Sequence, residues 1–203
     1  MLPVKSQYKV AKRLGAAVFE KTQSQKFALS DARSKKIKRG GRGGSDYGRQ
    51  LLEKQRVRFT YGLSERQLSN YAKEAYEAKD PSATLNRILE MRADSVAYRA
   101  GLAPSRRAAR QMVSHGHVII NGKRSRTPSH RLVKGDVITI REGSRMSPMY
   151  TTLTDENATK RAVPAWLSFD VSTLKVEVLG EPVYTQVADA GFDYSTVFEY
   201  YSR

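Results

Sequence analysis

Apolar residues recur at helical spacing in four stretches between residues 45 and 100, and this periodicity predicts four consecutive helices. Asp46 suits the first turn of the first helix, and Gly62 suits its C-terminal stop. The second helix opens with a capping box, in which Ser64 is followed three residues later by Gln67. The expected helices cover residues 45–62, 64–76, the segment that follows 80–82, and 94–100.

The stretch 102–141 changes from helical spacing to short apolar strands. A helix is expected from the capping residue Ser105 to about His115, with Gly116 in the left-handed position that ends it. Asn121-Gly122 then supplies the positive backbone dihedrals of a tight hairpin turn. The expected strands are 117–120 and 137–140. Together these elements predict a small helix-and-hairpin module.

The C-terminal part of the chain is expected to return to the helical unit. Trp166, Leu167 and Phe169 are interpreted as apolar anchors to that unit. Residues 174–179 alternate like a strand, and 183–187 is the expected partner of that strand. A last helix, from about Ser195, has Val197, Phe198 and Tyr201 on one face.

These patterns predict an α+β fold, in which a mostly helical unit carries an inserted small αβ module and follows a basic N-terminal arm. The module is expected to contain two helices and a short antiparallel sheet. The expected division is an arm at 1–44, a helical domain at 45–100 with 146–203, and the module at 101–145.

The composition narrows the class of partner. The 203 residues carry a net charge of +16, which indicates an anionic polymer or an anionic membrane surface as the partner. No stretch of eighteen apolar residues is present, and the first residues lack the apolar centre of a secretory signal, so no membrane partner is expected. The absence of cysteine excludes disulfides and thiolate metal sites, and it fits a reducing compartment such as the cytosol.

The positive charge is concentrated in two regions. One is the N-terminal arm, whose residues 33–44 combine six cations with four glycines and cannot bury enough surface to order themselves in water. This arm is therefore expected to be mobile and to fold against RNA; a merely solubilising tail is the alternative. The other is the module, where Arg106 and Arg110 lie four residues apart on one helix face with no acid nearby. A solvated basic face is again the alternative for any single arginine.

Two sequence motifs support a specific resemblance. The run Ser105-Arg106-Arg107-Ala108-Ala109-Arg110-Gln111-Met112-Val113-Ser114-His115-Gly116 and the run 118–122 resemble the RNA-binding module named after small-subunit ribosomal protein four. The segments 45–48, 50–51, 53–55, 61–63, 164–170 and 197–203 resemble the flanking parts of the bacterial-type ribosomal protein four family itself. The resemblance covers roughly residues 45–203, and a shorter basic head precedes it.

The resemblance implies a structural constituent of the small ribosomal subunit that binds the 5′ domain of small-subunit rRNA where several RNA helices meet. It also implies neighbours in ribosomal proteins three and five and a position beside the channel through which messenger RNA enters, in a cytoplasmic ribosome or an organellar one. Translational repression of its own messenger is known in the family. Many members carry N-terminal cysteines that bind zinc or an iron–sulfur cluster; this chain has none, so no cofactor is expected.

No catalytic constellation is expected, so the chain is interpreted as a non-enzyme. The histidines 115, 117 and 130 lack a third metal ligand at a recognisable spacing, and the glycine-rich run 40–44 lacks the ending of a P-loop. Pseudouridine synthases use an aspartate that follows an arginine, but Asp94 is interpreted here as a helix N-terminal residue. A free-standing RNA chaperone and an RNA-modifying enzyme that uses the same module are the alternative functions.

The candidate RNA-binding residues fall in three groups. The module contributes Arg106, Arg107, Arg110, Gln111, His115, Lys123, Arg124 and Arg126. The helical unit contributes Tyr47, Gln50, Lys54, Arg56 and Arg58, and the arm contributes Lys35, Lys36, Lys38, Arg39 and Arg42. Removing Arg106 and Arg110 together is expected to flatten the salt dependence of RNA binding, because each lost phosphate contact lowers the log–log slope by about 0.7–0.9.

Overall fold

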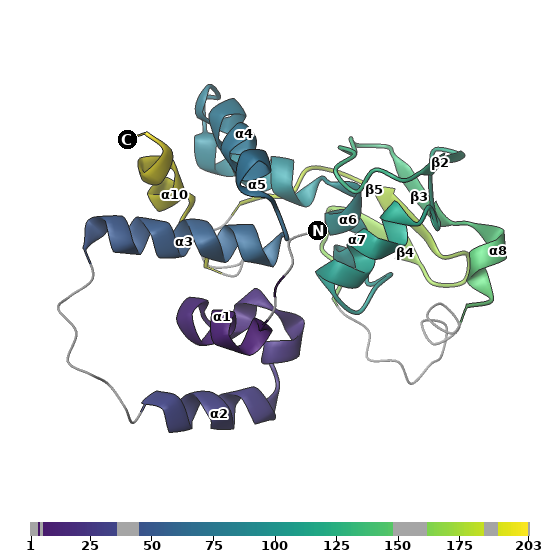
Figure 1. Ribbon diagram of the computed structural model, residues 1–203. Coiled ribbons are helices and arrows are strands. Elements are labelled where there is room, and N and C mark those ends of the chain that lie inside the picture. Colours follow the sequence, from purple (N-terminus) through teal and green to yellow (C-terminus); the bar gives the residue numbers. More distant parts are fainter. Residues whose placement is uncertain (1–3, 5, 36–44, 148–161, 185–190, 203) are drawn as a thin grey trace. The chain divides into compact units, whose positions relative to one another are not determined.

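The computed structural model describes residues 4, 6–35, 45–147, 162–184 and 191–202. The chain divides into two compact units, one made of residues 1–85 with 184–203 and the other of residues 86–183. Helices dominate the first unit, whereas the second combines helices with a five-stranded antiparallel sheet, so the expected α+β class is confirmed (Figure 1).

The first unit begins with helix α1 (Gln7–Leu14), two 3-10 turns (Ala16–Val18 and Glu20–Thr22) and helix α2 (Gln25–Lys35). Their apolar side chains form a small core, Ala11, Leu14, Val18, Phe19 and Phe27, against which Leu52 and Phe59 of the next helix pack. The ring centroids of Tyr8 and Phe27 lie 5.4 Å apart, and those of Phe19 and Phe59 lie 6.4 Å apart.

The expectation of a mobile arm was therefore wrong for residues 6–35. Their apolar residues are few, but Phe19 and Phe27 are large aromatic side chains whose burial contributes much of the stability of a small core. The apolar residues of this segment show little helical periodicity in the sequence, because the two helices are short and the 3-10 turns interrupt their spacing. The glycine-rich run 40–44 lies outside the described residues.

Three further helices complete the first unit: α3 (Asp46–Thr60), α4 (Glu65–Tyr76) and α10 (Tyr194–Tyr201). The predicted capping box is confirmed, since Ser64 and Gln67 exchange both side-chain-to-backbone hydrogen bonds at the start of α4. Gly62 has φ 62° and ends α3 as expected. Helix α5 (Pro81–Glu90) crosses the boundary between the units.

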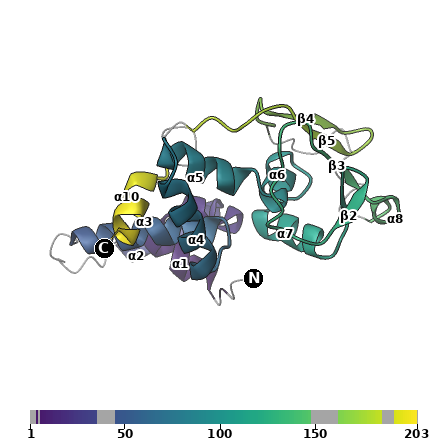
Figure 2. The same ribbon diagram turned by 90° about the horizontal axis from the view of Figure 1, so that it is seen from above.

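The second unit contains helices α6 (Ala93–Arg99), α7 (Arg106–Ser114) and α8 (Glu142–Arg145). Its strands are β1 (Val118–Ile120), β2 (Lys123–Ser125), β3 (Val137–Ile140), β4 (Leu167–Asp170) and β5 (Lys175–Val178), in the sheet order β2-β1-β3-β5-β4. Helices α6 and α7 lie along one face of this sheet, and their apolar residues share a core with alternate residues of the strands (Figure 2).

The sequence predicted the wrong partner for strand β5. Residues 183–187 were expected to pair with it, but β5 pairs with β4 on one side, Leu167 opposite Val178, and with β3 on the other, Ile138 opposite Val176. A hairpin between β4 and β5 satisfies the backbone locally, and the buried side chains of Val176 and Val178 then join the core of this sheet.

The same pairing places the expected anchor residues Trp166, Leu167 and Phe169 in the second unit. Leu167 belongs to the core of the second unit, and Trp166 and Phe169 pack against that core, so these residues do not attach the segment to the helical domain that was expected to include them. The division into compact units thus differs from the expected domains: residues 86–100 and 162–183 fold with the module, and only residues 184–203 return to the first unit.

Candidate nucleic-acid interface

Helix α7 presents one buried and one exposed face. Ser105 caps its first turn by accepting a hydrogen bond from the Ala108 amide at 3.2 Å. Ala109, Met112 and Val113 are buried in the core. The residues Arg107, Gln111, Ser114 and His115 are exposed. The spacing predicted a buried and an exposed face, with Arg106 and Arg110 on the exposed side. In the structure these two arginines are half-buried, and the exposed residues are one cation and three polar residues.

The hairpin that follows carries the second set of cations. Asn121 has φ 48° and Gly122 has φ 78°, as the tight turn requires. Asn121 also fixes the turn, because its amide donates to Asp136 at 2.8 Å and its oxygen accepts from the Val137 amide at 2.9 Å. Strand β2 is an edge strand, and Lys123, Arg124 and Arg126 are exposed along it.

Arg124 joins the hairpin to the end of α7. Its guanidinium donates to the carbonyl of Gly116 at 2.8 Å and to that of His115 at 3.1 Å. These carbonyls belong to the end of a helix, where cations stabilise the unpaired acceptors. Desolvation and the charges of Arg126 and Arg141 lower the pKa of Arg124. The exposed cations therefore stand close enough to repel one another.

Arg141 is a cation that the sequence analysis did not select. It follows β3 directly, and its amide donates to the carbonyl of His117 at 2.9 Å. Since β3 pairs with β1, with Ile140 opposite Val118, the register places Arg141 at the same end of the sheet as His117. The pairing of β3 with β1 is what identifies Arg141, and the sequence did not predict that pairing.

The environment of His117 disfavours its protonated form. Partial burial lowers its pKa, and the charges of His115, Arg124 and Arg141 lower it further. Its Nδ1 lies 2.9 Å from the buried hydroxyl of Ser144 in α8. His115, in contrast, is exposed at the end of α7, beside the Arg124 guanidinium.

Arg106 and Arg110 lie differently from the other candidates in the module. Arg106 forms an ion pair with Glu90 at 3.0 Å, and its guanidinium lies 4.7 Å from the ring centroid of Tyr98. Arg110 lies 4.0 Å from the carboxylate of Asp94. Both acids precede the module in the chain, so the residues of the module alone did not reveal them. Arg106 and Arg110 thus have intramolecular counter-charges, whereas the exposed Arg107 forms no ion pair with the described residues.

Asp94 confirms the interpretation as a helix N-terminal residue. It lies in the first turn of α6, where its carboxylate accepts from the Ser95 amide at 3.0 Å. The same carboxylate forms a buried ion pair with Arg92 at 2.7 Å. Arg92 and Asp94 therefore hold the start of α6 in place.

The candidates on α3 are divided between surface and interior. Gln50 is buried and donates to Glu199 at 3.0 Å, and Lys54 is buried with an ion pair to Glu65 at 2.9 Å. Arg56 pairs with Glu53 at 2.8 Å, while Arg58 lies 3.6 Å from Glu65. Tyr47 is exposed and its ring lies 5.7 Å from that of Tyr200. The geometry gives Gln50 and Lys54 roles in packing α10 and α4 against α3.

The structure describes only one of the candidate residues on the N-terminal arm. Lys35 is the last residue of α2. Lys36, Lys38, Arg39 and Arg42 lie outside the described residues.

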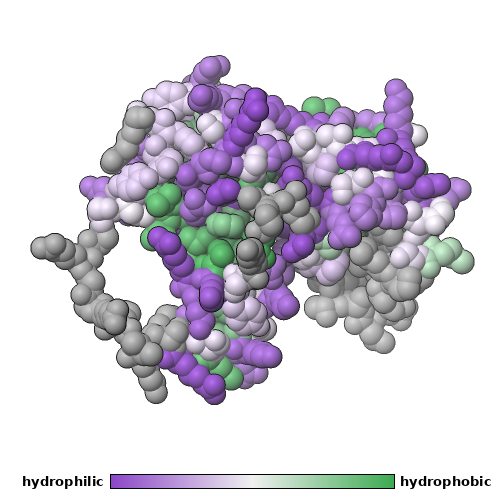
Figure 3. Space-filling view, in the orientation of Figure 1, coloured by the Kyte–Doolittle hydropathy of each residue, from purple (hydrophilic) through white to green (hydrophobic). Residues whose placement is uncertain are grey.

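The part of the second unit that is coloured in Figure 3 is mostly hydrophilic. Within the described part of the chain no three potential ligands gather as a metal site. Nor does any described helix have the length and apolar character needed to cross a membrane.

Two family models match the chain. The S4 domain matches residues 91–138, which hold α6, α7, β1, β2 and the start of β3. The ribosomal protein S4/S9 N-terminal domain matches residues 4–90. The second match begins well before residue 45, where the resemblance was expected to start, so the N-terminal helices belong to the family pattern as well.

Several curated relatives are similar over most of the chain. The small ribosomal subunit protein uS4 of Borrelia duttonii is 36% identical over 203 residues, covering 96% of this chain and 95% of the relative. The protein of the same name from Dehalococcoides mccartyi is 41% identical and covers 78% of this chain and 76% of its own length. That of Lachnospira eligens is 41% identical and covers 83% and 85%.

Proposed function

The chain belongs to the bacterial-type ribosomal protein S4 family, and from this premise we propose that it is a structural, non-enzymatic component of the small ribosomal subunit that binds ribosomal RNA. The relatives carry the name of a small-subunit protein, which supports the structural role. The family match to the S4 domain supports RNA as the partner.

One observation carries the RNA-binding part of the proposal: the exposed cations of α7 and the hairpin. They are Arg107, Lys123, Arg124, Arg126 and Arg141, and the polar residues Gln111 and His115 are exposed on α7 and at its end. Guanidinium and ammonium groups suit phosphate oxygens. Because A-form RNA hides its base edges in a deep, narrow groove, this surface is suited to the backbone and shape of folded RNA.

The finer parts of the proposal rest on the family. The RNA would be the 5′ domain of small-subunit rRNA, at a junction of several helices, and the neighbours would be ribosomal proteins three and five. A place beside the channel through which messenger RNA enters, in a cytoplasmic ribosome, belongs to the same proposal. The exposed cations would then help to hold messenger RNA there as well as ribosomal RNA.

Hydroxyl-radical footprinting of the full chain on intact small-subunit rRNA tests the proposal. A ribosomal protein of this family protects one contiguous junction in the 5′ domain, whereas an RNA chaperone protects many unrelated sites to a similar extent. The same RNA, digested to nucleosides after incubation, remains unmodified. Scattered protection, or the appearance of a modified nucleoside, would overturn the proposal.

A further inference from the structure

A hollow between α1 and α2 in the first unit has the composition of an anion site. Its volume is about 520 Å³, and Lys12, Lys26, Leu29, Ser30 and Arg33 line it. Three of these five residues are cations and none is an acid. All three cations are exposed, so the hollow is open to a large partner. None of these residues was among the candidates selected from the sequence.

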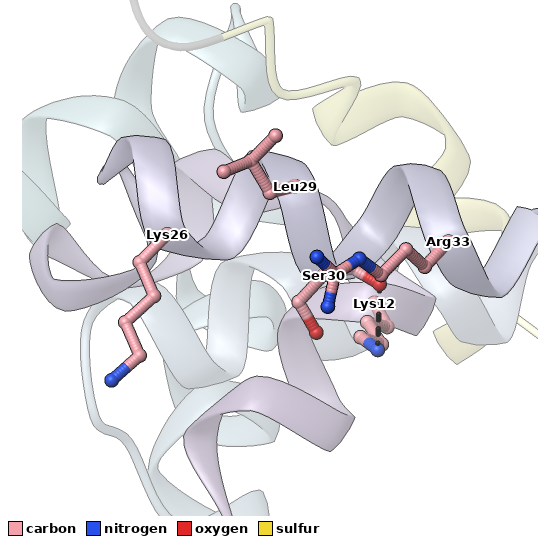
Figure 4. Close-up of a pocket in the computed structure, with 5 residues that line it drawn as sticks. All are labelled: Lys12, Lys26, Leu29, Ser30 and Arg33. Atoms are coloured by element: carbon pink, nitrogen blue, oxygen red, sulfur yellow. Dashed lines mark hydrogen bonds between the residues drawn. The ribbon is translucent and has the colours of Figure 1, made fainter.

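The two helices place the cations in a defined arrangement. Lys26, Ser30 and Arg33 follow one another at intervals of four and three residues and so share one face of α2. Lys12 comes from α1, and its ammonium donates to the Ser30 carbonyl at 3.1 Å. In Figure 4, Arg33 reaches back along α2 toward Ser30, whereas Lys26 extends away from these residues at the other end of the hollow. Positive charge therefore borders the hollow at both ends.

Leu29 is the apolar residue among the five that line the hollow, and its side chain is 58% exposed. The buried Phe27 on the same helix faces the small core, so α2 is held by that core while Leu29 remains uncovered. At the bottom of Figure 3, over α2, a small hydrophobic area is bordered by hydrophilic side chains.

We propose that this hollow binds a short stretch of RNA backbone, with successive phosphates at the cationic ends and the intervening sugar against Leu29. The inference rests on the proposed function, because that function supplies the RNA. Separated cations with an apolar wall fit a phosphate-sugar-phosphate segment better than a lone phosphate ion, which would need converging donors. The surrounding residues 6–35 carry seven basic and two acidic residues, so the site lies in a positive local field.

The salt dependence of RNA affinity tests the site. In the full chain, Lys26→Gln with Arg33→Gln removes two of the three cations but keeps Lys12, whose ammonium bonds the backbone. The log–log salt slope for 5′-domain rRNA should fall by about 1.4–1.8, the value for two phosphate contacts. The matched control, Lys9→Gln with Lys21→Gln, removes the same charge from exposed positions outside the hollow and should change the slope by less than half of that.

The outcomes separate this site from the proposed function. If the unaltered chain protects the rRNA junction but the two variants have equal slopes, the site is wrong and the function stands. If the unaltered chain binds that RNA no better than unrelated RNA, both are wrong.

A photo-crosslinker at position 29 in assembled small subunits should attach to RNA. Attachment to a protein instead, or none above that of a crosslinker at position 76, would overturn the site.

Discussion

Gly116 and Arg124 determine how α7 ends and how the hairpin is held against it. Gly116 has φ 73°, a conformation that side chains rarely adopt. A Cβ at this position would lie 2.5 Å from Nε of Arg124. The Arg124 guanidinium therefore occupies the space that a side chain at position 116 would need. The candidate cation Arg124 is thus in part a helix cap, and this local role orients the neighbouring cations.

We expect Gly116→Ala to destabilise the protein by about 2–3 kcal/mol. Positive φ costs an alanine about 1–2 kcal/mol. Displacement of the Arg124 guanidinium adds about 1 kcal/mol by releasing hydrogen bonds to the end of α7. Chemical denaturation followed by circular dichroism measures the loss.

Gly101 provides the matched control. It follows α6 with φ 86°, but a Cβ there would meet no atom within 4 Å. Gly101→Ala should therefore cost only the 1–2 kcal/mol that positive φ requires. In an Arg124→Ala background the cost of Gly116→Ala should fall to that of Gly101→Ala, because the colliding side chain is gone. Equal costs for the two glycines in the unaltered chain would contradict the packing described.

Helix α10 is held to the first unit by polar contacts to the partly exposed side chain of Glu65. Lys54 of α3 forms an ion pair with Glu65 of α4, and the Tyr201 hydroxyl of α10 donates to the same carboxylate at 2.9 Å. The Lys54 ammonium also lies 4.0 Å from the ring centroid of Tyr200. Helix α10, which is distant in sequence, therefore meets the consecutive helices α3 and α4 at Glu65.

This arrangement predicts how the attachment of α10 depends on pH. Burial of the Glu65 carboxyl by itself raises its pKa, but hydrogen bonds from Lys54 and Tyr201 outweigh burial and lower the pKa below its ordinary 4.5. A lowered pKa stabilises the folded state above 4.5, and the contribution disappears as the pH falls through the folded value. Hydrogen-exchange protection factors of the α10 amides should therefore decrease when the pH is lowered from 5.5 to 3.5.

Two variants attribute that decrease to Glu65. Glu65→Gln removes the titrating group, so α10 should be less protected at pH 5.5 and should show a smaller further change on acidification. Glu77→Gln, at the exposed end of α4, should leave the pH dependence as it is. A similar pH dependence in Glu65→Gln and in the unaltered chain would exclude Glu65 as the source.

The elements differ in how far the sequence could predict them. Local signals such as the Ser64–Gln67 capping box and the Asn121-Gly122 turn predicted α4 and the hairpin, because a few adjacent residues determine them. The pairing of β5 with β3 joins residues about forty positions apart, and nothing in either strand identifies its partner. For the same reason the acid partners of Arg106 and Arg110 were missed, and these two arginines, expected on the exposed side of α7, are half-buried.

At the scale of the whole molecule, the exposed cations are distributed over both compact units. The second unit presents those of α7 and the hairpin, and the first presents those that line the hollow between α1 and α2. Many candidate cations have acids as partners within their own unit, as Arg56 and Lys54 do, so net charge alone overstates the RNA-binding surface. The account therefore depends on the exposed cations of these two surfaces rather than on the total number of cations.

The most direct test of this claim is the salt slope of rRNA binding when three exposed cations are removed together. Arg107→Gln, Lys123→Gln and Arg126→Gln should lower the log–log slope by about 2.1–2.7, with the footprint on the junction weakened. Arg66→Gln, Lys73→Gln and Lys79→Gln remove the same charge from exposed positions of the first unit and should leave the slope nearly unchanged. Equal slopes in the two triple variants would contradict the account, because binding would then follow total charge and not the surface formed by α7 and the hairpin.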